Sequence, residues 1–304
     1  MKKCVLLSVF FLACGMLQTH AQFSRYVIRL KNKTGTPFTV DKPEAFLSKR
    51  SIERRQRQKI AVSSKDLPVT PSYVTQISQT GAKVWYTSRW LNAVLVEATS
   101  AQLTTIRNLS FVNGIEFNRA LYNARVSAEN QSKATNRKFG EEALNYGASQ
   151  NQIQMLGADK MHDQGYNGKG MLVGIFDGGF RNSNTNTTLK TILTENRVVS
   201  TFDFVKKETS VYEDDSHGNN VFSIMASFQE GSLIGPAYGA SFTLLRTEDG
   251  GSETRLEEAN WLFAAEYADS AGADIITSSL GYSTFDDTSA SHTYADMNGN
   301  TCPS

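Results

Sequence analysis

The sequence predicts two folded units, a small α+β domain followed by an α/β domain built on a doubly wound parallel sheet. Residues 22–117 have the order strand, helix, strand, strand, helix, strand, typical of helices packed on one face of an antiparallel sheet. From residue 148 to residue 304, near-continuous apolar strands alternate with helices, which favours a parallel sheet covered on both faces. The polar residues 118–147 between them are expected to be an exposed linker.

The first 21 residues are predicted to be a secretory signal peptide and no part of the fold. Lys2 and Lys3 give a positive start, residues 5–16 form an apolar run, and Ala21 supplies a small residue for cleavage. The apolar run is too short to span a bilayer comfortably, which argues against a membrane anchor. A lipoprotein modified at Cys14 is an alternative, but the bulky residues before that cysteine fit its cleavage box poorly. We therefore expect a secreted or cell-surface protein.

Composition excludes several classes of protein. The 304 residues are 40% hydrophobic and 20% charged, which is ordinary for a soluble globular protein. A formal net charge of +1 gives no reason to expect a nucleic-acid partner. Of the 3 cysteines, Cys4 and Cys14 leave with the signal peptide, so Cys302 can form no internal disulfide. No other stretch is long and apolar enough to span a membrane.

The elements of the small domain follow from periodicity and caps. Residues 25–30 alternate polar and apolar side chains, as in a half-buried strand. Thr70 and Pro71 mark the start of one helix, and Thr99 or Ser100 caps another. The remaining prediction is a helix over 45–60 and strands over 83–87, 93–98 and 111–117.

A basic run in the first helix has three interpretations. It comprises Arg50, Arg54, Arg55, Arg57 and Lys59. A nucleic-acid patch is disfavoured, because Glu53 interrupts the run and no aromatic residues are interleaved. We expect a solvated helix face, with a processing site for another peptidase as a minor alternative.

The second domain is predicted as alternating strands and helices. The strands cover 171–176, 198–205, 240–245 and 273–278, and the helices cover 151–156, 160–164, 221–228 and 254–271. A capping box of Thr254 and Glu257 opens the longest helix, and Gly272 ends it.

Asp177 follows a buried apolar strand, and the glycines Gly178 and Gly179 allow a sharp turn beside it. Open α/β sheets place their sites at the carboxyl ends of strands. A carboxylate there suits the task of holding an imidazole in one tautomer. The alternative is an aspartate that only caps a loop.

His217 suits the role of the base that such a carboxylate would hold. Of the histidines left after signal cleavage, at positions 162, 217 and 292, only His217 lies at a predicted helix start. Gly218 follows it and lets the ring point into a cleft. The alternatives are a structural histidine, or a metal site with Asp214 and Asp215, for which no second His or Cys lies nearby.

An Asp and then a His on an α/β pattern resembles the subtilisin-like serine peptidases (subtilases, peptidase S8 type), whose triad runs Asp, His, Ser along the chain. The family's first motif is a strand followed by Asp, Ser or Thr, and Gly; here Asp177 precedes two glycines. The second motif is His-Gly-Thr-His-Val, and here His217 begins His-Gly-Asn-Asn-Val. The Asp, the His, the flanking glycines and Val221 match, whereas positions 178, 219 and 220 differ.

A third block extends the resemblance over roughly residues 146–281. The run from Ile234 to Ser279, Leu280 and Gly281 is similar to the family's run from its Gly-x-Ala-Pro turn to its Ser-Leu-Gly. In the family that Ser-Leu-Gly backbone lines the primary specificity pocket and pairs with extended substrate. The resemblance implies the same substrate-binding role for these three residues.

The resemblance implies a secreted serine endopeptidase precursor that acts on proteins or peptides. Asp177 would orient His217, His217 would act as general base and then acid, and a downstream Ser would attack the carbonyl. The domain over 22–117 resembles the family's inhibitory propeptide, with a ferredoxin-like fold, and would be the chain's own inhibitor. Calcium sites are frequent in the family, but no acidic cluster here has a readable coordination spacing.

The chain has no Gly-Thr-Ser motif, and residues 282–304 offer no candidate for the family's oxyanion-hole Asn. We therefore expect a fragment that carries part of the sheet and lacks normal peptidase activity. The alternative is a catalytically dead pseudopeptidase or a secreted binding module that keeps the fold. A nucleotide-binding protein is disfavoured, because Gly168 and Gly170 precede the strand and no Gly-x-Gly-x-x-Gly follows it.

Overall fold

The computed structural model describes residues 23–116, 119–123, 144–282 and 284–287. We call residues 23–123 the N-terminal unit and residues 144–287 the C-terminal unit, each taken without its undescribed positions. The predicted signal peptide and most of the predicted linker lie outside the described residues. Within the described part of the chain, no helix has the length and apolar character needed to cross a bilayer.

The N-terminal unit is an antiparallel sheet covered by helices. Its strands are β1 (Ser24–Leu30), β2 (Lys83–Ser88), β3 (Ala93–Ala98) and β4 (Val112–Ile115), in the order β2-β3-β1-β4, with the short β5 (Tyr122–Asn123) paired to β1. Between β1 and β2 lie η1 (Pro43–Ala45), α1 (Lys49–Gln58), η2 (Ser64–Asp66) and α2 (Pro71–Gln79), and α3 (Ser100–Arg107) joins β3 to β4. This order is the predicted ferredoxin-like α+β arrangement.

Caps explain where these helices begin. Thr99 and Gln102 form a reciprocal capping box at the start of α3. Thr70 precedes α2 as predicted, but its hydroxyl donates to the carbonyl of Thr34 and makes no cap bond. The predicted helix over 45–60 is divided, because Ser48 has an extended backbone and its hydroxyl accepts from Ser51 to start α1.

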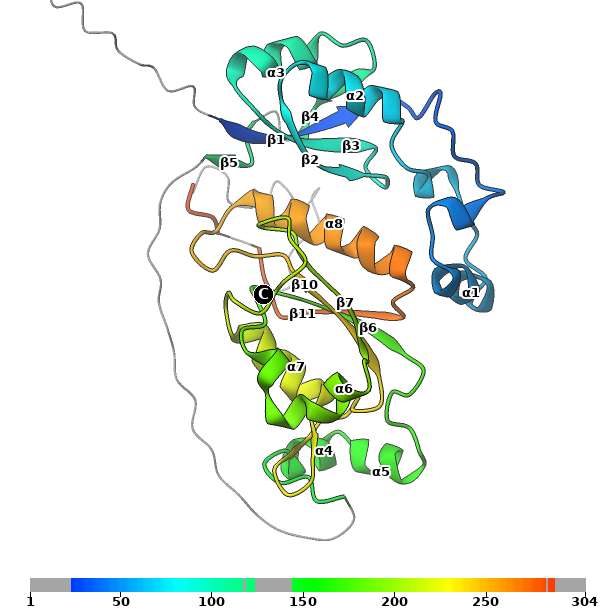
Figure 1. The fold of residues 1–304 in the computed structure, drawn as a ribbon, viewed down its shortest axis with the longest axis vertical. Coiled ribbons are helices and arrows are strands. Elements are labelled where there is room, and N and C mark those ends of the chain that lie inside the picture. The colour runs from blue at the N-terminus through cyan, green and yellow to red at the C-terminus, as the bar shows by residue number, and fades with distance from the viewer. Residues whose placement is uncertain (1–22, 117–118, 124–143, 283, 288–304) are drawn as a thin grey trace, which may run out of the picture.

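Both faces of the N-terminal sheet are buried (Figure 1). Val94 and Val96 of β3 pack with Ile106 of α3 on one face. Leu95, which points to the other face, belongs to the same core as Phe263 of α8 (Arg255–Ala271) in the C-terminal unit. Since successive side chains of a strand point to opposite faces, burial on both faces explains why β3 is apolar almost throughout.

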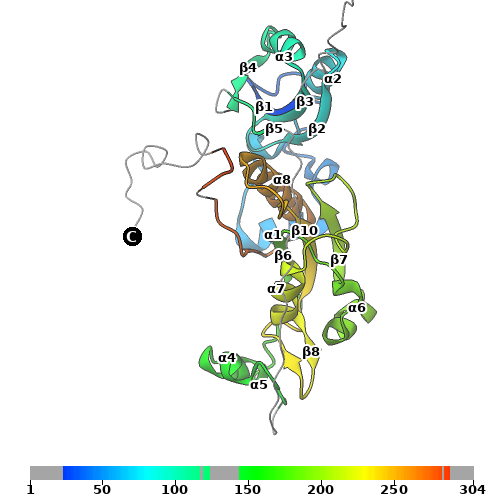
Figure 2. The same ribbon diagram turned by 90° about the vertical axis from the view of Figure 1, so that its left-hand side faces the viewer.

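The C-terminal unit is a parallel sheet with helices on both faces, which confirms the predicted fold class. Its strands are β6 (Leu172–Asp177), β7 (Val198–Asp203), β10 (Ser241–Arg246) and β11 (Ile275–Ser278), in the order β11-β6-β10-β7. α8 covers one face, and α6 (Lys190–Thr194) and α7 (His217–Ala226) cover the other (Figures 1 and 2). η4 (Ser183–Thr185) and η5 (Thr187–Leu189) precede α6.

A small subdomain lies at the end of the C-terminal unit that is farthest from the N-terminal unit (Figure 1). It consists of α4 (Gln150–Met155), α5 (Ala158–Asp163) and the hairpin of β8 (Phe228–Gln229) and β9 (Leu233–Ile234). Tyr146, Ile153 and Ile234 form its buried core. The predicted helix over 221–228 therefore ends two residues early, because Phe228 pairs in the hairpin.

Two local predictions are wrong, one of them in part. The side chain of Thr254 makes no cap bond at the start of α8, so the predicted capping box is not formed. The basic run is a solvated helix face only in part: Arg57 and Lys59 are exposed, whereas the side chains of Arg54 and Arg55 are only 12% and 7% exposed and pair with carboxylates. The reason is tertiary: α1 lies against the carboxyl-terminal end of α8, where Asp269 binds both guanidinium groups.

Candidate functional site

The two residues proposed from sequence to share a proton meet at the carboxyl edge of the parallel sheet. Asp177 is the last residue of β6, and His217 is the first residue of α7. The Nδ1 atom of His217 lies 2.8 Å from Oδ1 and 3.0 Å from Oδ2 of Asp177. The geometric expectation is met, whereas the catalytic roles of the two residues stay predictions.

Hydrogen bonds hold the side chain of Asp177 and the backbone of His217 in place. The amide of Gly178 donates to Oδ1 of Asp177 at 2.8 Å. The amide of His217 donates to Oδ1 of Asp215 at 2.6 Å, so Asp215 satisfies the start of α7 in place of the N-cap residue Ser216, whose side chain makes no cap bond. Sequence reasoning considered Asp215 only as a metal ligand and missed this role, although an Asp just before a helix start is the usual signal for it.

Two glycines allow the loops of Asp177 and His217 to approach each other. A Cβ on Gly218 would overlap the carbonyl oxygen of Gly179 and lie 2.9 Å from the Cβ of Asp177. Gly179 has φ of 154°, and a Cβ there would lie 2.6 Å from the amide nitrogen of Asp215. This close packing explains why glycine is required at position 179, shortly after Asp177, and at position 218, directly after His217.

Asp177 and His217 differ in exposure to solvent and in the cause of their pKa shifts. Asp177 is fully buried, whereas the side chain of His217 is 54% exposed. Burial raises the pKa of the Asp177 carboxyl. The hydrogen bond that the Asp177 carboxylate accepts from Nδ1 of His217 raises the pKa of the imidazole. Because Nδ1 is engaged by the carboxylate, Nε2 is the ring nitrogen left for a reacting group.

Further titratable groups lie at the same edge of the sheet. Glu248 follows the end of β10, and burial raises its pKa to about 7. The negative charges of Asp215 and Glu248 add to the rise in the pKa of His217. The imidazole is thus surrounded by carboxyl groups that favour its protonated form.

Arg246 was not anticipated from the sequence, yet it links the loops around the site. It ends β10 in register with Asp177, and its Nε donates to the carbonyl of Gly178 at 2.8 Å. Its Nη1 donates to Asp203 at 2.8 Å and lies 3.4 Å from Asp214, which is three residues before His217. Both Arg246 and Asp203 are buried. In the sequence, the feature that could have identified Arg246 was a single charged residue at the end of an apolar strand.

Three carboxylates near Arg246 have oxygens within 4.8 Å of one another, those of Asp203, Glu208 and Asp214. Cations of the chain already pair with this group, since Arg246 binds Asp203 and Lys206 lies 2.6 Å from Asp214. The calcium that is frequent in the resembled family is therefore not assigned to this group. Among the described residues, the group of possible metal ligands does not include His217 or Asp215, and Nδ1 of His217 is bound to Asp177.

The predicted substrate-binding residues Ser279, Leu280 and Gly281 follow β11 directly. β11 pairs in parallel with β6, so these residues lie at the same sheet edge as Asp177. Ser279 and Gly281 are exposed, and Leu280 is partly buried. Their binding role stays a prediction.

Two further polar residues, His162 and Asn219, make structural contacts. Both ring nitrogens of His162 are engaged, Nδ1 with the hydroxyl of Tyr146 at 2.7 Å and Nε2 with the carbonyl of Pro236 at 3.0 Å. Asn219, where the sequence departs from the family motif, accepts from the side-chain amide of Asn186 at 3.2 Å. That bond fixes the first turn of α7 to the segment before η5.

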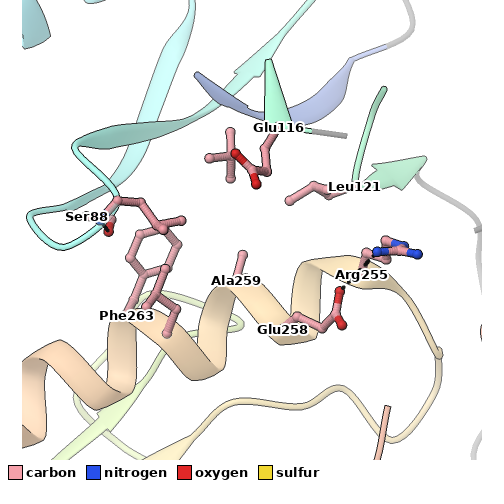
Figure 3. A pocket seen from close by; sticks show the side chains of 10 residues that line it. Ser88, Glu116, Leu121, Arg255, Glu258, Ala259 and Phe263 are labelled. Atoms are coloured by element: carbon pink, nitrogen blue, oxygen red, sulfur yellow. Dashed lines mark hydrogen bonds and ion pairs between the residues drawn. The ribbon is translucent and has the colours of Figure 1, made fainter. Parts of the chain in front are cut away.

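Two cavities lie between the units and not at the Asp177–His217 pair. One of about 210 Å³ is lined by Leu121 and Ser88 on the N-terminal side and by Ala259 and Phe263 of α8 (Figure 3). The other, of about 440 Å³, includes Tyr86 and Phe263 among its lining residues. No residue of the predicted site lines either cavity.

Family models match both units. The model of the peptidase S8 propeptide domain of Bacteroidota matches residues 25–136, and the model of the subtilase family matches residues 168–301. Subtilisin E of Bacillus subtilis (strain 168) and subtilisin NAT of Bacillus subtilis subsp. natto are each 28% identical over 132 residues, which cover 42% of this chain and 32% of theirs. The chain thus spans about a third of the length of these relatives.

Solved structures show a weaker likeness. Fervidolysin from Fervidobacterium pennivorans, a keratinolytic enzyme related to subtilisin, has 15% identity and a TM-score of 0.48, over 90% of this chain and 38% of that one. The epidermin leader peptide processing serine protease of Staphylococcus aureus has 15% identity and a TM-score of 0.45, over 88% and 54%. The fold assignment rests on the strand order above and on the family models. The chain belongs to the subtilisin-like serine peptidases and carries a propeptide of that family ahead of its subtilase segment.

Proposed function

We propose that this chain is the amino-terminal part of the precursor of a secreted serine endopeptidase, in which Asp177 and His217 are two members of an Asp-His-Ser triad. The observation that carries the proposal is the 2.8 Å contact between Nδ1 of His217 and Oδ1 of Asp177 at the carboxyl edge of the parallel sheet. No Gly-Thr-Ser motif occurs in the 304 residues. The proposal therefore assigns the nucleophile to sequence that the longer relatives contain and that is not included here.

The geometry supports a general-base role for His217. A serine hydroxyl is a weak nucleophile until a base takes its proton, and the free Nε2 is the atom to take it. The buried Asp177 fixes the tautomer with the proton on Nδ1 and stabilises the imidazolium that forms. His217 would then return the proton to the leaving amine. The raised pKa of the imidazole agrees with a carboxylate partner that favours the charged form.

Substrate would be a protein or peptide in extended conformation. Ser279, Leu280 and Gly281 continue the edge strand β11 beyond its pairing with β6. An extended peptide that adds to this backbone as a strand would lie beside the Asp177–His217 pair. We assign the three residues to substrate binding on that ground.

The N-terminal unit would act as the inhibitor of its own peptidase. Its β2–β3 turn meets α8 through Glu266, whose carboxylate accepts from the hydroxyl of Ser88 at 2.6 Å and from the amides of Arg89 and Trp90 at 2.9 and 3.2 Å. A carboxylate with three donors in a buried setting is a specific attachment. We place the propeptide at 22–117, the linker at 118–147 and the subtilase segment from 148, with residues 1–21 as the secretion signal.

One experiment tests the function. The coding sequence is read beyond codon 304, and the complete precursor is produced and assayed for hydrolysis of casein. We expect a Gly-Thr-Ser motif, activity after propeptide removal, labelling by a serine-directed phosphonate, and no activity from the 304 residues alone. His217→Ala and Asp177→Asn should each abolish most of the hydrolysis by the complete enzyme. A stop codon at this point would favour the pseudopeptidase or binding module, and full activity of His217→Ala would refute the assigned roles.

A further inference from the structure

We propose that the carboxyl-terminal end of α8 is a guanidinium-binding site that holds helix α1 of the propeptide as a second, separately releasable attachment. The first attachment is the packing of the N-terminal sheet and of the β2–β3 turn on the middle of α8. One consequence of the proposal, release of the inhibitor in two steps, rests on the proposed function; the attachment itself does not.

Asp269 is the centre of this site. Its carboxylate pairs with Arg54, with Arg55 at 2.8 Å and with Arg89 at 2.8 Å. A negative charge in the last turn of a helix is disfavoured by the helix dipole, so α8 alone gives Asp269 no stabilisation. Its partners all come from the N-terminal unit, and the side chain is only 12% exposed. The arginines therefore compensate a charge that would otherwise destabilise the helix end.

Asp274 extends the site to the parallel sheet. It pairs with Arg50 and, at 3.3 Å, with Arg57. The same carboxylate accepts the amide of Leu172 at 2.9 Å, at the start of β6. The attachment of α1 thus reaches the strand that ends in Asp177.

α1 also satisfies the carbonyl groups at the end of α8. The amide of Ser48 donates to the carbonyl of Ser270 at 3.0 Å, and the hydroxyl of Ser51 donates to that of Asp269 at 2.7 Å. Arg50 and Arg54 donate to the carbonyls of Gly272 and Ala273 at 3.1 and 2.6 Å, respectively. α8 ends in a glycine cap, in which the amide of Gly272 donates to the carbonyls of Ala268 and Asp269. The propeptide adds donors for the carbonyls at and after this end, where the regular hydrogen bonds of the helix stop.

The contacts of α1 with the end of α8 are polar, whereas the contact of the N-terminal sheet with the middle of α8 is mainly apolar. The buried residues of α1 are Ser51 and Arg55, and none of its side chains belongs to the apolar core shared by the two units. A helix of 10 residues is marginal in water by itself. α1 should therefore unfold locally when its carboxylate partners are lost, while α2 and the sheet keep their apolar packing.

The test is hydrogen exchange of backbone amides in the complete 304-residue chain, with α1 and α2 followed separately. Arg54→Gln and Asp269→Asn should each raise the exchange rate of α1 amides by about tenfold or more, because each removes a largely buried ion pair between α1 and the end of α8. The rate in α2 should not change. The double variant should add less than the sum of the two single effects, since both remove one interaction.

A matched control lies on the same helix. Lys49→Gln removes a charge whose side chain is 91% exposed and whose contact with Glu53 is 3.8 Å long, so α1 exchange should not change. Unchanged α1 exchange in Arg54→Gln, or equal acceleration of α1 and α2, would overturn the proposal. If Asp269→Asn does not fold, Arg54→Gln decides alone, because it alters only the helix that is proposed to open. No hydrolysis is measured, so an inactive complete enzyme would leave the result intact.

Discussion

Replacing Glu266 should loosen the propeptide from α8 by an amount that its contacts define. The side chain is 7% exposed, and its carboxylate accepts from the hydroxyl of Ser88 and from the amides of Arg89 and Trp90. Glu266→Ala leaves these three donors without a partner. A buried donor left unpaired costs about 1–3 kcal/mol, and water that enters the space recovers part of it, so we expect a loss of about 4 kcal/mol.

Glu266→Gln should lower the free energy of unfolding by about 2 kcal/mol. One oxygen of the new side chain can still accept a hydrogen bond, but its NH₂ group would point at hydrogen-bond donors. The assay is urea unfolding at pH 7 followed by tryptophan fluorescence, because Trp85 and Trp90 lie at the contact with α8. Glu195→Ala is the control, since Glu195 pairs with Arg197 at the surface. A loss below about 1 kcal/mol for Glu266→Ala, or equal losses for the two variants, would refute the reasoning.

Four further predictions concern the C-terminal unit. Gly218→Ala should cost about 1–3 kcal/mol of stability in a thermal unfolding experiment, since its Cβ would overlap the facing turn; an unchanged midpoint would contradict this. Arg246→Leu should cost about 3–5 kcal/mol in urea unfolding because a buried carboxylate loses its partner; a loss below about 1 kcal/mol would count against the link. Burial raises the pKa of Glu257 to about 9, so its proton stabilises the folded state at low pH and the benefit is lost as pH rises from about 5 through 9; Glu257→Gln should flatten the measured pH dependence of unfolding over that window. Asp177→Asn should lower the pKa of the His217 imidazole in an NMR titration of the chain, and no change would show that the carboxylate does not act on the ring.

The sequence was sufficient to place the Asp177–His217 pair because each residue is fixed by a local signal. A buried strand followed by a glycine turn positions Asp177, and a helix start followed by Gly218 positions His217. In a parallel sheet the carboxyl ends of the strands share one edge, so topology brings two such signals together. The prediction also used the fold class, which the alternation of apolar strands and helices supplied, and the resemblance of both segments to the subtilase motifs.

Contacts between residues far apart in the chain could not be predicted in this way. Arg54 and Ala273, which share a hydrogen bond, are 219 positions apart. The solvated-face interpretation used the correct propensity of an arginine-rich helix, and tertiary pairing with Asp269 overrode it. Arg246 was missed for the same reason, since its partner Asp203 comes from a neighbouring strand that the sequence does not identify.

The position of α8 explains why the propeptide and the subtilase segment depend on each other for burial of apolar surface. One side of the helix packs on the strand that ends in Asp177, where Trp261 meets Phe176 with ring centroids 5.5 Å apart. The other side, with Phe263 and Tyr267, packs in a core shared with the N-terminal sheet. A helix that is apolar on opposite sides is stable only when both are covered. Departure of the propeptide would expose the second side to water at about 25 cal/mol for each Å² of apolar surface. Burial of this second side thus favours retention of the propeptide, and a chain cut between the two units would by itself leave the propeptide bound.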